Sequence, residues 1–314
     1  MPLPLAKETK FGIQTRLPTP DLTEKTVEML DQLDFDSVWV GDHLAFTLPI
    51  LDPFVQLAHA CAYSRKLTVA SGVYLLPMRH PAAAAKQAAS LDHLSEGRFI
   101  FGVGVGGEFP KEWQLVDVPT SERGARLTEG IEVMRKLWTG DPVAHKGKFY
   151  SFEEVHMQPA TFRKGGPPIW CGGRSEAALK RTGRLADGYL SYVITPDMFR
   201  EALTKIEEAA EEAGREMNDF GSGHLLFCCI DETYEKAWDK ATELLSERYA
   251  MDFRRAAERY CAMGTPEDVA GKIKEFHDAG VRHFVFDFLG DQPQRMVSLE
   301  QFAYEVLPFL TDIR

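Results

Sequence analysis

The sequence predicts a single (β/α)8 TIM barrel, a closed ring of eight parallel strands that alternate with helices. Short apolar segments typical of strands alternate with longer amphipathic segments along all 314 residues. No internal repeat, low-complexity tract or linker divides the chain, which predicts one domain over residues 1–314. A doubly wound open sheet is the rival fold, but no Gly-x-Gly-x-x-Gly follows the first strand.

Four strand–helix pairs are predicted in the first half of the chain. Asp21, with Glu24 three residues later, is typical of a capping box, and Pro53 and Pro81 suit the first turn of a helix. Gly140 is typical of a helix end. The predicted strands are 11–15, 36–40, 67–76 and 99–105, and the predicted helices are 21–33, 52–61, 81–94 and 122–138.

The alternation resumes after an insertion at about 141–166, before strand five. This insertion is rich in aromatic residues, Pro and Gly, and Lys146-Gly147-Lys148 predicts a small hairpin in it. The later strands are predicted at 168–172, 188–193, 224–230 and 283–289. The later helices are predicted at 175–185, 196–213, twice within 233–263, at 265–280 and at 298–310.

Composition and charge narrow the class of protein. The hydrophobic content of 44% and the charged content of 26% are typical of a soluble globular enzyme. A formal charge of −11 argues against a nucleic-acid partner, and no apolar run approaches the roughly 18 residues that span a membrane. Five cysteines without a Cys-x-x-Cys pair, and no apolar signal core, predict a reducing, cytoplasmic location. The chain has no His-x-His or cysteine cluster, so we expect no metal.

The fourth strand carries glycines at alternate positions and ends in a carboxylate. Gly102, Gly104, Gly106 and Gly107 precede Glu108. Glycine within a strand usually marks a close approach of a ligand or of another backbone. A flat ring could therefore lie against this strand, with Glu108 at its exit. The alternative is a crowded barrel strand in which the glycines only make room.

In a barrel of this kind the active site forms at the carboxyl ends of the strands. Strand two delivers Asp42 and His43 there, but neighbouring side chains on a strand point to opposite faces, so these two do not predict a dyad. His43 is either a proton donor and acceptor or only a satisfied polar residue. The other strand ends deliver Gly72, Val73 and Tyr74, then Gly106 to Glu108, then Cys171, Gly172, Gly173, Arg174 and Ser175, and finally Tyr192 and Asp287.

The fifth strand ends in a sequence suited to a phosphate. Gly172-Gly173-Arg174-Ser175 comes directly before a predicted helix, so free backbone N–H groups meet a guanidinium and a hydroxyl. The alternative is a plain glycine turn in which Ser175 caps the helix.

Several segments together resemble the bacterial luciferase-like oxidoreductases, over about residues 11–219 with a weaker match to 310. The branch that the chain resembles most uses the deazaflavin coenzyme F-420 instead of FMN. The matching segments are 38–43 (VWVGDH), 72–81 (GVYLLPMRHP), 91–98 (LDHLSEGR), 102–106 (GVGVG), 123–126 (RGAR) and 168–178 (PIWCGGRSEAA).

The resemblance implies roles for particular residues. It implies a bulge with a non-prolyl cis peptide at Gly72–Val73 that presses on the deazaflavin ring. It implies that His43 is the active-site acid or base and that Glu108 handles a proton. The residues expected to bind the cofactor are Asp42, Gly72, Val73, Gly104, Gly106, Gly107, Gly172, Gly173, Arg174 and Ser175, the last three at its phosphate.

Three functions remain open at this point. The first is an oxidoreductase that transfers a hydride between coenzyme F-420 and a small organic substrate. The second is an FMN-dependent monooxygenase that works with a separate flavin reductase, and the third is a non-catalytic flavin-binding barrel. The resemblance also implies a homodimer. Phe46, Leu48 and Ile50, after strand two, predict an apolar lid.

Overall fold

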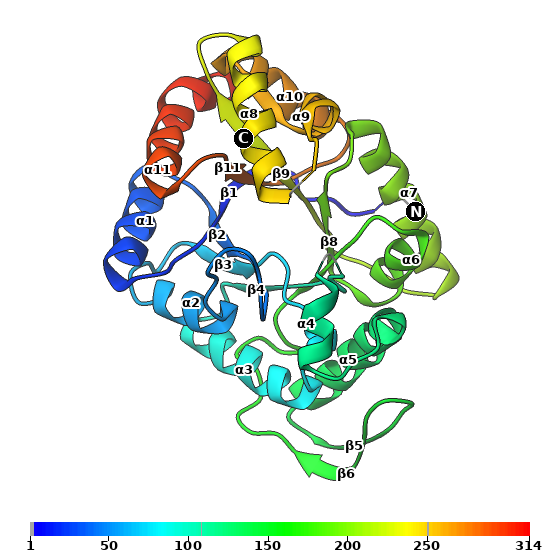
Figure 1. Cartoon of the computed structure of the whole chain (residues 1–314). Helices are drawn as coiled ribbons and strands as arrows, with labels where there is room; N and C mark the ends of the chain where they lie inside the picture. The colour runs from blue at the N-terminus through cyan, green and yellow to red at the C-terminus, as the bar shows by residue number, and fades with distance from the viewer. Residues whose placement is uncertain (1–2, 108, 250) are drawn as a thin grey trace.

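In the computed structural model, which describes residues 3–107, 109–249 and 251–314, eight parallel strands form a closed barrel. The order around the ring is β1-β2-β3-β4-β7-β8-β9-β11, and β9 pairs with both β8 and β11 to close it. This confirms the predicted (β/α)8 fold. The barrel strands, at the centre of Figure 1, are β1 (Lys10–Thr15), β2 (Ser37–Val40), β3 (Thr68–Ser71), β4 (Phe99–Val103), β7 (Ile169–Gly172), β8 (Gly188–Tyr192), β9 (Gly221–Ile230) and β11 (His283–Phe288).

Helices surround the barrel, and each buries its apolar stripe against the strands. Leu30, Leu57 and Ile131, from three of these helices, are fully buried in that layer. The surrounding helices are α1 (Pro20–Gln32), α2 (Pro53–Ala60), α3 (Pro81–Leu94), α5 (Arg123–Trp138), α6 (Glu176–Leu185), α7 (Pro196–Glu212), α10 (Pro266–Asp278) and α11 (Gln292–Gln301). Every helix in the described part of the chain is too short or too polar to cross a bilayer.

Further elements connect or extend this scaffold. β10 pairs with the end of β9, and α8 and α9 lie between these two strands in the chain. The chain closes with a π-helix and a 3-10 helix after α11. These elements are α4 (Pro110–Leu115), α8 (Tyr234–Tyr249), α9 (Arg254–Tyr260), β10 (Ala262–Gly264), the 3-10 helices Leu76–Met78, Thr120–Glu122 and Leu307–Leu310, and the π-helix Phe302–Val306.

The strands divide their side chains between two cores. Successive residues of a strand point to opposite faces, so Val38 packs outward among the helices while Trp39 points into the barrel. The rings of Trp39 and Trp170 lie 5.5 Å apart inside the barrel. A Cβ on Gly221 would come within 2.0 Å of the Trp170 ring, so this glycine makes room for the indole. Leu245 of α8 joins the inner core, which places this helix over one end of the barrel.

Several predicted element boundaries are wrong for local reasons. The third strand ends at Ser71 instead of residue 76, because the chain then leaves the sheet and turns into the 3-10 helix Leu76–Met78. The first helix is capped by Thr19, which accepts a hydrogen bond from the Leu22 N–H, and not by Asp21. The sequence prediction missed α4 and β10, and it started the last helix six residues late because the Asp291 cap was overlooked.

The glycines of β4 make room for the exit of β3. A Cβ on Gly102 would lie 1.9 Å from the Ser71 carbonyl oxygen, and one on Gly104 would lie 2.5 Å from Val73 Cγ2. Protein atoms thus fill the space in which we expected a ring to lie directly against β4. At these two positions the structure supports the alternative, a strand in which glycine relieves crowding.

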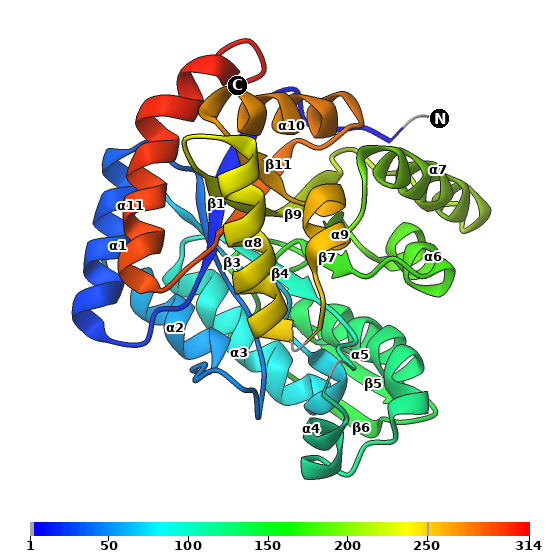
Figure 2. The ribbon, with the colours of Figure 1, turned by 45° about the horizontal axis from the view of Figure 1, so that its top comes forward.

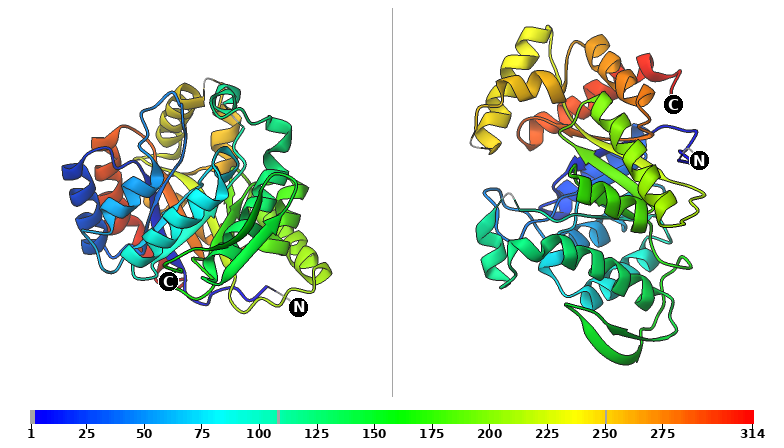
Figure 3. Two further views of the ribbon diagram at one scale, coloured as in Figure 1. Left: turned by 90° about the horizontal axis from the view of Figure 1, so that it is seen from below. Right: turned by 90° about the vertical axis from the view of Figure 1, so that its right-hand side faces the viewer.

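The insertion forms the predicted hairpin, with β5 (Pro142–Lys146) antiparallel to β6 (Ser151–His156). The hairpin stands away from the barrel beyond α5 (Figure 3). Glu129 of α5 holds its turn, since its carboxylate accepts the N–H groups of Lys148, Phe149 and Tyr150 at 2.8 to 3.1 Å. Burial opposes ionisation of Glu129, but these hydrogen bonds outweigh it and lower the pKa of the carboxyl.

We expect Gly102→Ala to destabilise the fold by about 1 to 3 kcal/mol, because the added methyl group collides with backbone that cannot move freely. The matched control is Gly271→Ala in α10, where a Cβ meets nothing within 4 Å. That variant should be neutral or slightly stabilising, because alanine favours a helix. Urea denaturation of both variants gives the comparison, and equal stabilities would show that the close approach to Ser71 is not a constraint.

We expect the stabilisation from Glu129 to depend on pH. A carboxyl whose pKa is lowered on folding stabilises the protein above its unfolded pKa, about 4.3, and this contribution fades as the pH falls through the folded pKa. Glu129→Gln should therefore lower the free energy of unfolding at pH 7, and the deficit should shrink below about pH 4.3. Urea denaturation across this range is the measurement, with exposed Glu154→Gln as the control. A deficit that does not change with pH would contradict the role of the ionised carboxylate.

Candidate active site

The predicted site residues gather at one end of the barrel, because all eight strands are parallel and their carboxyl ends coincide. His43 follows β2, Val73 follows β3, and Gly173 follows β7. Glu108 lies outside the described residues, so its role stays a prediction. Within the described residues, no group of three or more His, Cys, Asp or Glu could hold a metal ion. The five cysteines are all buried free thiols.

A buried carboxylate orients the His43 side chain. Glu112 of α4 accepts a hydrogen bond from His43 Nδ1 at 2.9 Å and is itself almost completely buried. The same carboxylate accepts the N–H groups of Leu44 at 2.6 Å and Ala45 at 2.9 Å. A carboxylate can only accept, so the neutral imidazole carries its proton on Nδ1 and presents a lone pair on Nε2. In the neutral imidazole, the contact with Glu112 therefore leaves Nε2 as the atom that can receive a proton.

Aromatic side chains enclose the imidazole on its other sides. Phe46 stacks on His43 with ring centroids 4.1 Å apart, and Phe109 meets it edge-on at 5.7 Å. Phe46 and Phe109 also contact each other at 4.5 Å. Leu48 farther along the same segment is exposed. The segment after β2 therefore places one of its predicted lid residues directly on His43, while the lid itself stays a prediction.

Asp42 points away from His43 into a separate ion pair, as the alternation of side chains predicted. Its Oδ1 accepts Arg79 Nη2 at 2.7 Å, and its Oδ2 accepts the Leu75 N–H at 2.8 Å and a second Arg79 nitrogen. The Arg79 guanidinium also lies over the Tyr74 ring, 4.5 Å from its centroid. Asp42 thus ties the end of β2 to the chain that leaves β3. Its predicted contact with a cofactor stays a prediction.

The peptide bond between Gly72 and Val73 is cis, as the sequence resemblance implied. The Val73 side chain lies between β4 and β7, because a Cβ on Gly172 would come within 3.1 Å of its Cγ1 and one on Gly104 within 2.5 Å of its Cγ2. Gly106 and Gly107 follow with φ angles of 56° and 122°, a region that favours glycine. Three neighbouring strands therefore carry small residues around one projecting valine.

The loop after β7 exposes the start of α6. Ser175 caps this helix by accepting the Ala178 N–H at 3.3 Å, so the capping alternative is present. Gly173 has a φ of 118°, and Arg174 donates one hydrogen bond to the Val193 carbonyl at 3.0 Å. Gly173, Arg174 and Ser175 are all exposed. Unused N–H groups of the first helical turn and the remaining donors of Arg174 fit a phosphate.

Positively charged side chains gather at the end of β11, on the other side of the barrel end from the β7 loop. The sequence prediction did not bring these residues together. Asp287 of β11 accepts Arg295 at 2.6 Å and Arg248 at 2.9 Å. Burial disfavours the charged carboxylate, but the two guanidinium groups outweigh it and lower the pKa of Asp287. Tyr249, next to Arg248 in α8, forms a hydrogen bond with Tyr192 at the end of β8. These contacts attach α8 to the site end of the barrel (Figure 2).

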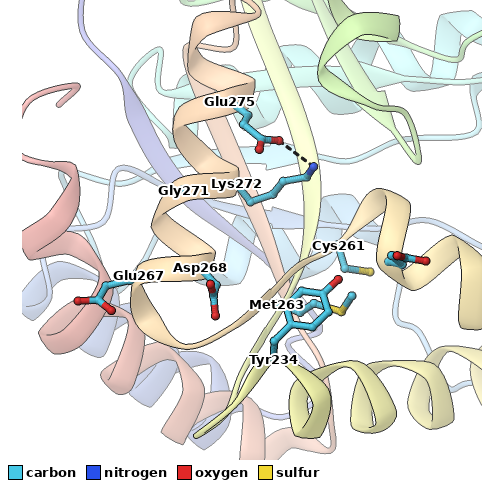
Figure 4. A pocket seen from close by; sticks show the side chains of 9 residues that line it. Tyr234, Cys261, Met263, Glu267, Asp268, Gly271, Lys272 and Glu275 are labelled. Carbon is cyan, nitrogen blue, oxygen red and sulfur yellow. Dashed lines mark hydrogen bonds and ion pairs between the residues drawn. The ribbon is translucent and has the colours of Figure 1, made fainter.

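Two cavities lie elsewhere. One of about 350 Å³ lies between α8, α9 and α10 and is lined by Tyr234, Cys261, Met263 and several acidic residues (Figure 4). Lys272 is the one basic residue among the described residues that line this cavity. It forms an ion pair with Glu275 at 2.8 Å. The other, of about 270 Å³, lies at the amino end of the barrel. None of the predicted site residues that the structure describes lines either cavity.

The fold and the site define a (β/α)8 barrel whose polar groups converge at the carboxyl ends of its strands. Residues 7–283 match the family described as luciferase-like monooxygenase, and the chain belongs to this family. An F-420-dependent glucose-6-phosphate dehydrogenase of Amycolatopsis mediterranei is 28% identical over alignments covering 92% of this chain and 94% of that protein.

Two further proteins are similar to the chain. An uncharacterized protein of Mycobacterium tuberculosis is 37% identical over 167 residues. That match covers 53% of this chain and only 57% of the relative, so the chain spans little more than half of it. The crystal structure of a monooxygenase from Streptomyces bottropensis superposes with a TM-score of 0.82 at 26% identity, covering 95% of this chain and 99% of the other.

We expect Glu112→Gln to loosen the segment that follows β2. The amide keeps the size of the carboxylate but loses its charge, which weakens the hydrogen bonds from Leu44, Ala45 and His43. Exchange of the Leu44 and Ala45 amide hydrogens should become about tenfold faster. Glu122→Gln, which removes a surface partner of Arg126, is the control. Unchanged exchange at both amides would show that Glu112 does not hold this segment.

Proposed function

We propose that the chain is an oxidoreductase that transfers a hydride between coenzyme F-420 and a small organic substrate. The observation that carries this proposal is the His43–Glu112 pair, an oriented proton acceptor at the end of the barrel where the cofactor is expected. The F-420-dependent dehydrogenase relative, which matches along 92% of the chain, supports the choice of cofactor.

The residues that would hold the cofactor fit its chemistry. Gly173, Arg174 and Ser175 would bind its phosphate through exposed backbone N–H groups, a guanidinium and a hydroxyl. Val73 would support the ring. Gly106 and Gly107 would carry the backbone past it with φ angles that favour glycine. When bound, the deazaflavin supplies the hydride chemistry.

His43 would move the proton that accompanies the hydride. Its Nε2 lone pair can accept the hydroxyl proton of a substrate that is oxidised, or return a proton when the direction is reversed. The resulting imidazolium would face the Glu112 carboxylate across the 2.9 Å hydrogen bond, which stabilises the positive charge where it forms. Phe46 and Phe109 would limit the access of water to the imidazole ring of His43. Glu108 is proposed as a second proton-handling group.

An FMN-dependent monooxygenase is the second candidate function. The family description and the 26% identical monooxygenase structure favour it. This activity would need a separate flavin reductase as a partner. A non-catalytic flavin-binding barrel is the third candidate, and it has no need of a buried carboxylate that orients an imidazole. A homodimer, a cytoplasmic location and the absence of nucleic-acid and membrane partners are part of the proposal.

Titration of the purified protein with F-420 and, separately, with FMN tests the cofactor. Quenching of cofactor fluorescence should show micromolar or tighter binding of F-420 and much weaker binding of FMN. The reverse preference would replace the proposal with the monooxygenase function. Binding of neither would favour the non-catalytic barrel.

The role of His43 needs its own variant. With a substrate found by screening alcohols and phosphorylated sugars, His43→Ala should lower kcat about 100-fold or more, because general acid–base catalysis is lost. The affinity for F-420 should stay within a few-fold. Exposed His156→Ala in the hairpin is the control and should match the parent enzyme. Equal losses of kcat and cofactor affinity would make His43 a binding residue instead.

A further inference from the structure

Four ionic side chains meet at the ends of β1 and β11. Arg16 follows β1, Asp287 lies near the end of β11, Arg248 comes from α8 and Arg295 from α11. We call these four residues the arginine cluster. Arg295 and Arg248 each take one oxygen of Asp287, at 2.6 and 2.9 Å. Two guanidinium groups therefore share one carboxylate, and the charge of Arg16 adds to theirs. The chain as a whole has a formal net charge of −11.

The positive charge of Arg16 has no anionic partner in contact with it among the described residues. It is partly buried, and it has no hydrogen bond or ion pair with any residue that the structure describes. Burial and the positive charges of Arg295 and Arg248 lower its pKa, and Asp287 offsets this only in part. Both oxygens of Asp287 are already used by the other two arginines. A guanidinium in such surroundings is stabilised by an added anion.

The alternation of side chains along β1 and β11 indicates that Arg16 and Asp287 of the cluster point toward the axis of the barrel. Val285 belongs to the inner core, so Asp287, two residues later, is on the inward face of β11. A Cβ placed on Gly72 would lie 2.9 Å from Gln14 Oε1, so the Gln14 side chain points into the barrel. Arg16, two residues later and just past the end of β1, continues on the same inward side.

The cluster also lies on the far side of the barrel end from the expected cofactor loop. β1 and β11 are adjacent in the ring and stand opposite β4 and β7, which carry the glycine and phosphate-loop residues (Figure 1). Arg248 is fixed there by α8, whose Leu245 joins the inner core. A group bound at the cluster would face the cofactor across the barrel end instead of overlapping its phosphate.

We propose that the arginine cluster binds an anionic group of the substrate, a phosphate or a carboxylate. This inference rests on the proposed function, since it names the substrate class of the same site. Guanidinium groups match the oxygens of both anions with paired hydrogen bonds. Asp287 holds Arg248 and Arg295 in place, and Arg16 supplies the donors that are not yet used.

Calorimetric titration with inorganic phosphate and, separately, with acetate tests the site in the protein with and without F-420. Arg16→Gln should weaken binding of the preferred anion about tenfold or more, since charged hydrogen bonds are lost. Arg16→Lys should recover part of the affinity by keeping the charge. Arg200→Gln, which alters an exposed pair with Asp197 on α7, should leave it unchanged. Tighter phosphate than acetate binding would identify a phosphorylated substrate, and the reverse a carboxylated one.

The outcomes that would overturn the inference are distinct from failure of the proposed function. Equal anion binding by Arg16→Gln and the parent protein would overturn it, because the anion would then bind elsewhere. Loss of Arg16-dependent anion binding on saturation with F-420 would assign the cluster to the cofactor and overturn it as well. F-420 fluorescence tests the proposed function separately. If the protein did not bind F-420 but still bound the anion through Arg16, the anion site would stand and the proposed cofactor would be rejected.

Discussion

The chain that leaves β3 passes so close to β4 that neither Gly102 in β4 nor Gly104 just after it has room for a side chain. The Ser71 carbonyl and the Val73 side chain fill that space. Close packing of this kind leaves little freedom, since interiors are as dense as organic crystals. Two further contacts fix the same chain: Asp42 accepts the Leu75 N–H, and the Tyr74 N–H donates to the Gly102 carbonyl at 2.7 Å.

This constraint places the polar groups of the site. Because the exit of β3 is held against β4 and β7, Val73 projects from a fixed position between them. The Asp42–Arg79 pair joins that exit to the segment that follows β2, and His43 is the next residue of that segment. Glu112 then fixes the imidazole from α4. Opposite β4 and β7 in the ring, α8 attaches Arg248 to Asp287. This positive charge lies at the end of β11, which only β1 separates from the strand that His43 follows.

Most of the fold could be predicted from local signals. Apolar strands, helix caps and prolines such as Pro81 mark the elements where they stand in the sequence, and the cis peptide at Gly72–Val73 followed from family resemblance. Glu112 could not be found, because it lies 69 residues from His43 in a six-residue helix without a motif. The arginine cluster could not be predicted for the same reason, since Arg16, Arg248 and Arg295 are far apart in the sequence and come together only in the folded barrel.

The roles of the glycines show where pattern reasoning fails. Alternate glycines in a strand indicate a close approach, but they do not say whether a ligand or another strand approaches. At Gly104 the group that approaches is the Val73 side chain. The glycine therefore contributes to the site by making room for Val73 and not by contacting a ligand.

A crystal structure of the chain with F-420 bound is the measurement that tests the central claim most directly. The account predicts the cofactor phosphate at Gly173 to Ser175, the deazaflavin ring against Val73, and His43 Nε2 facing the ring with the Glu112 contact intact. A ring bound away from Val73, with His43 turned from it, would contradict the account.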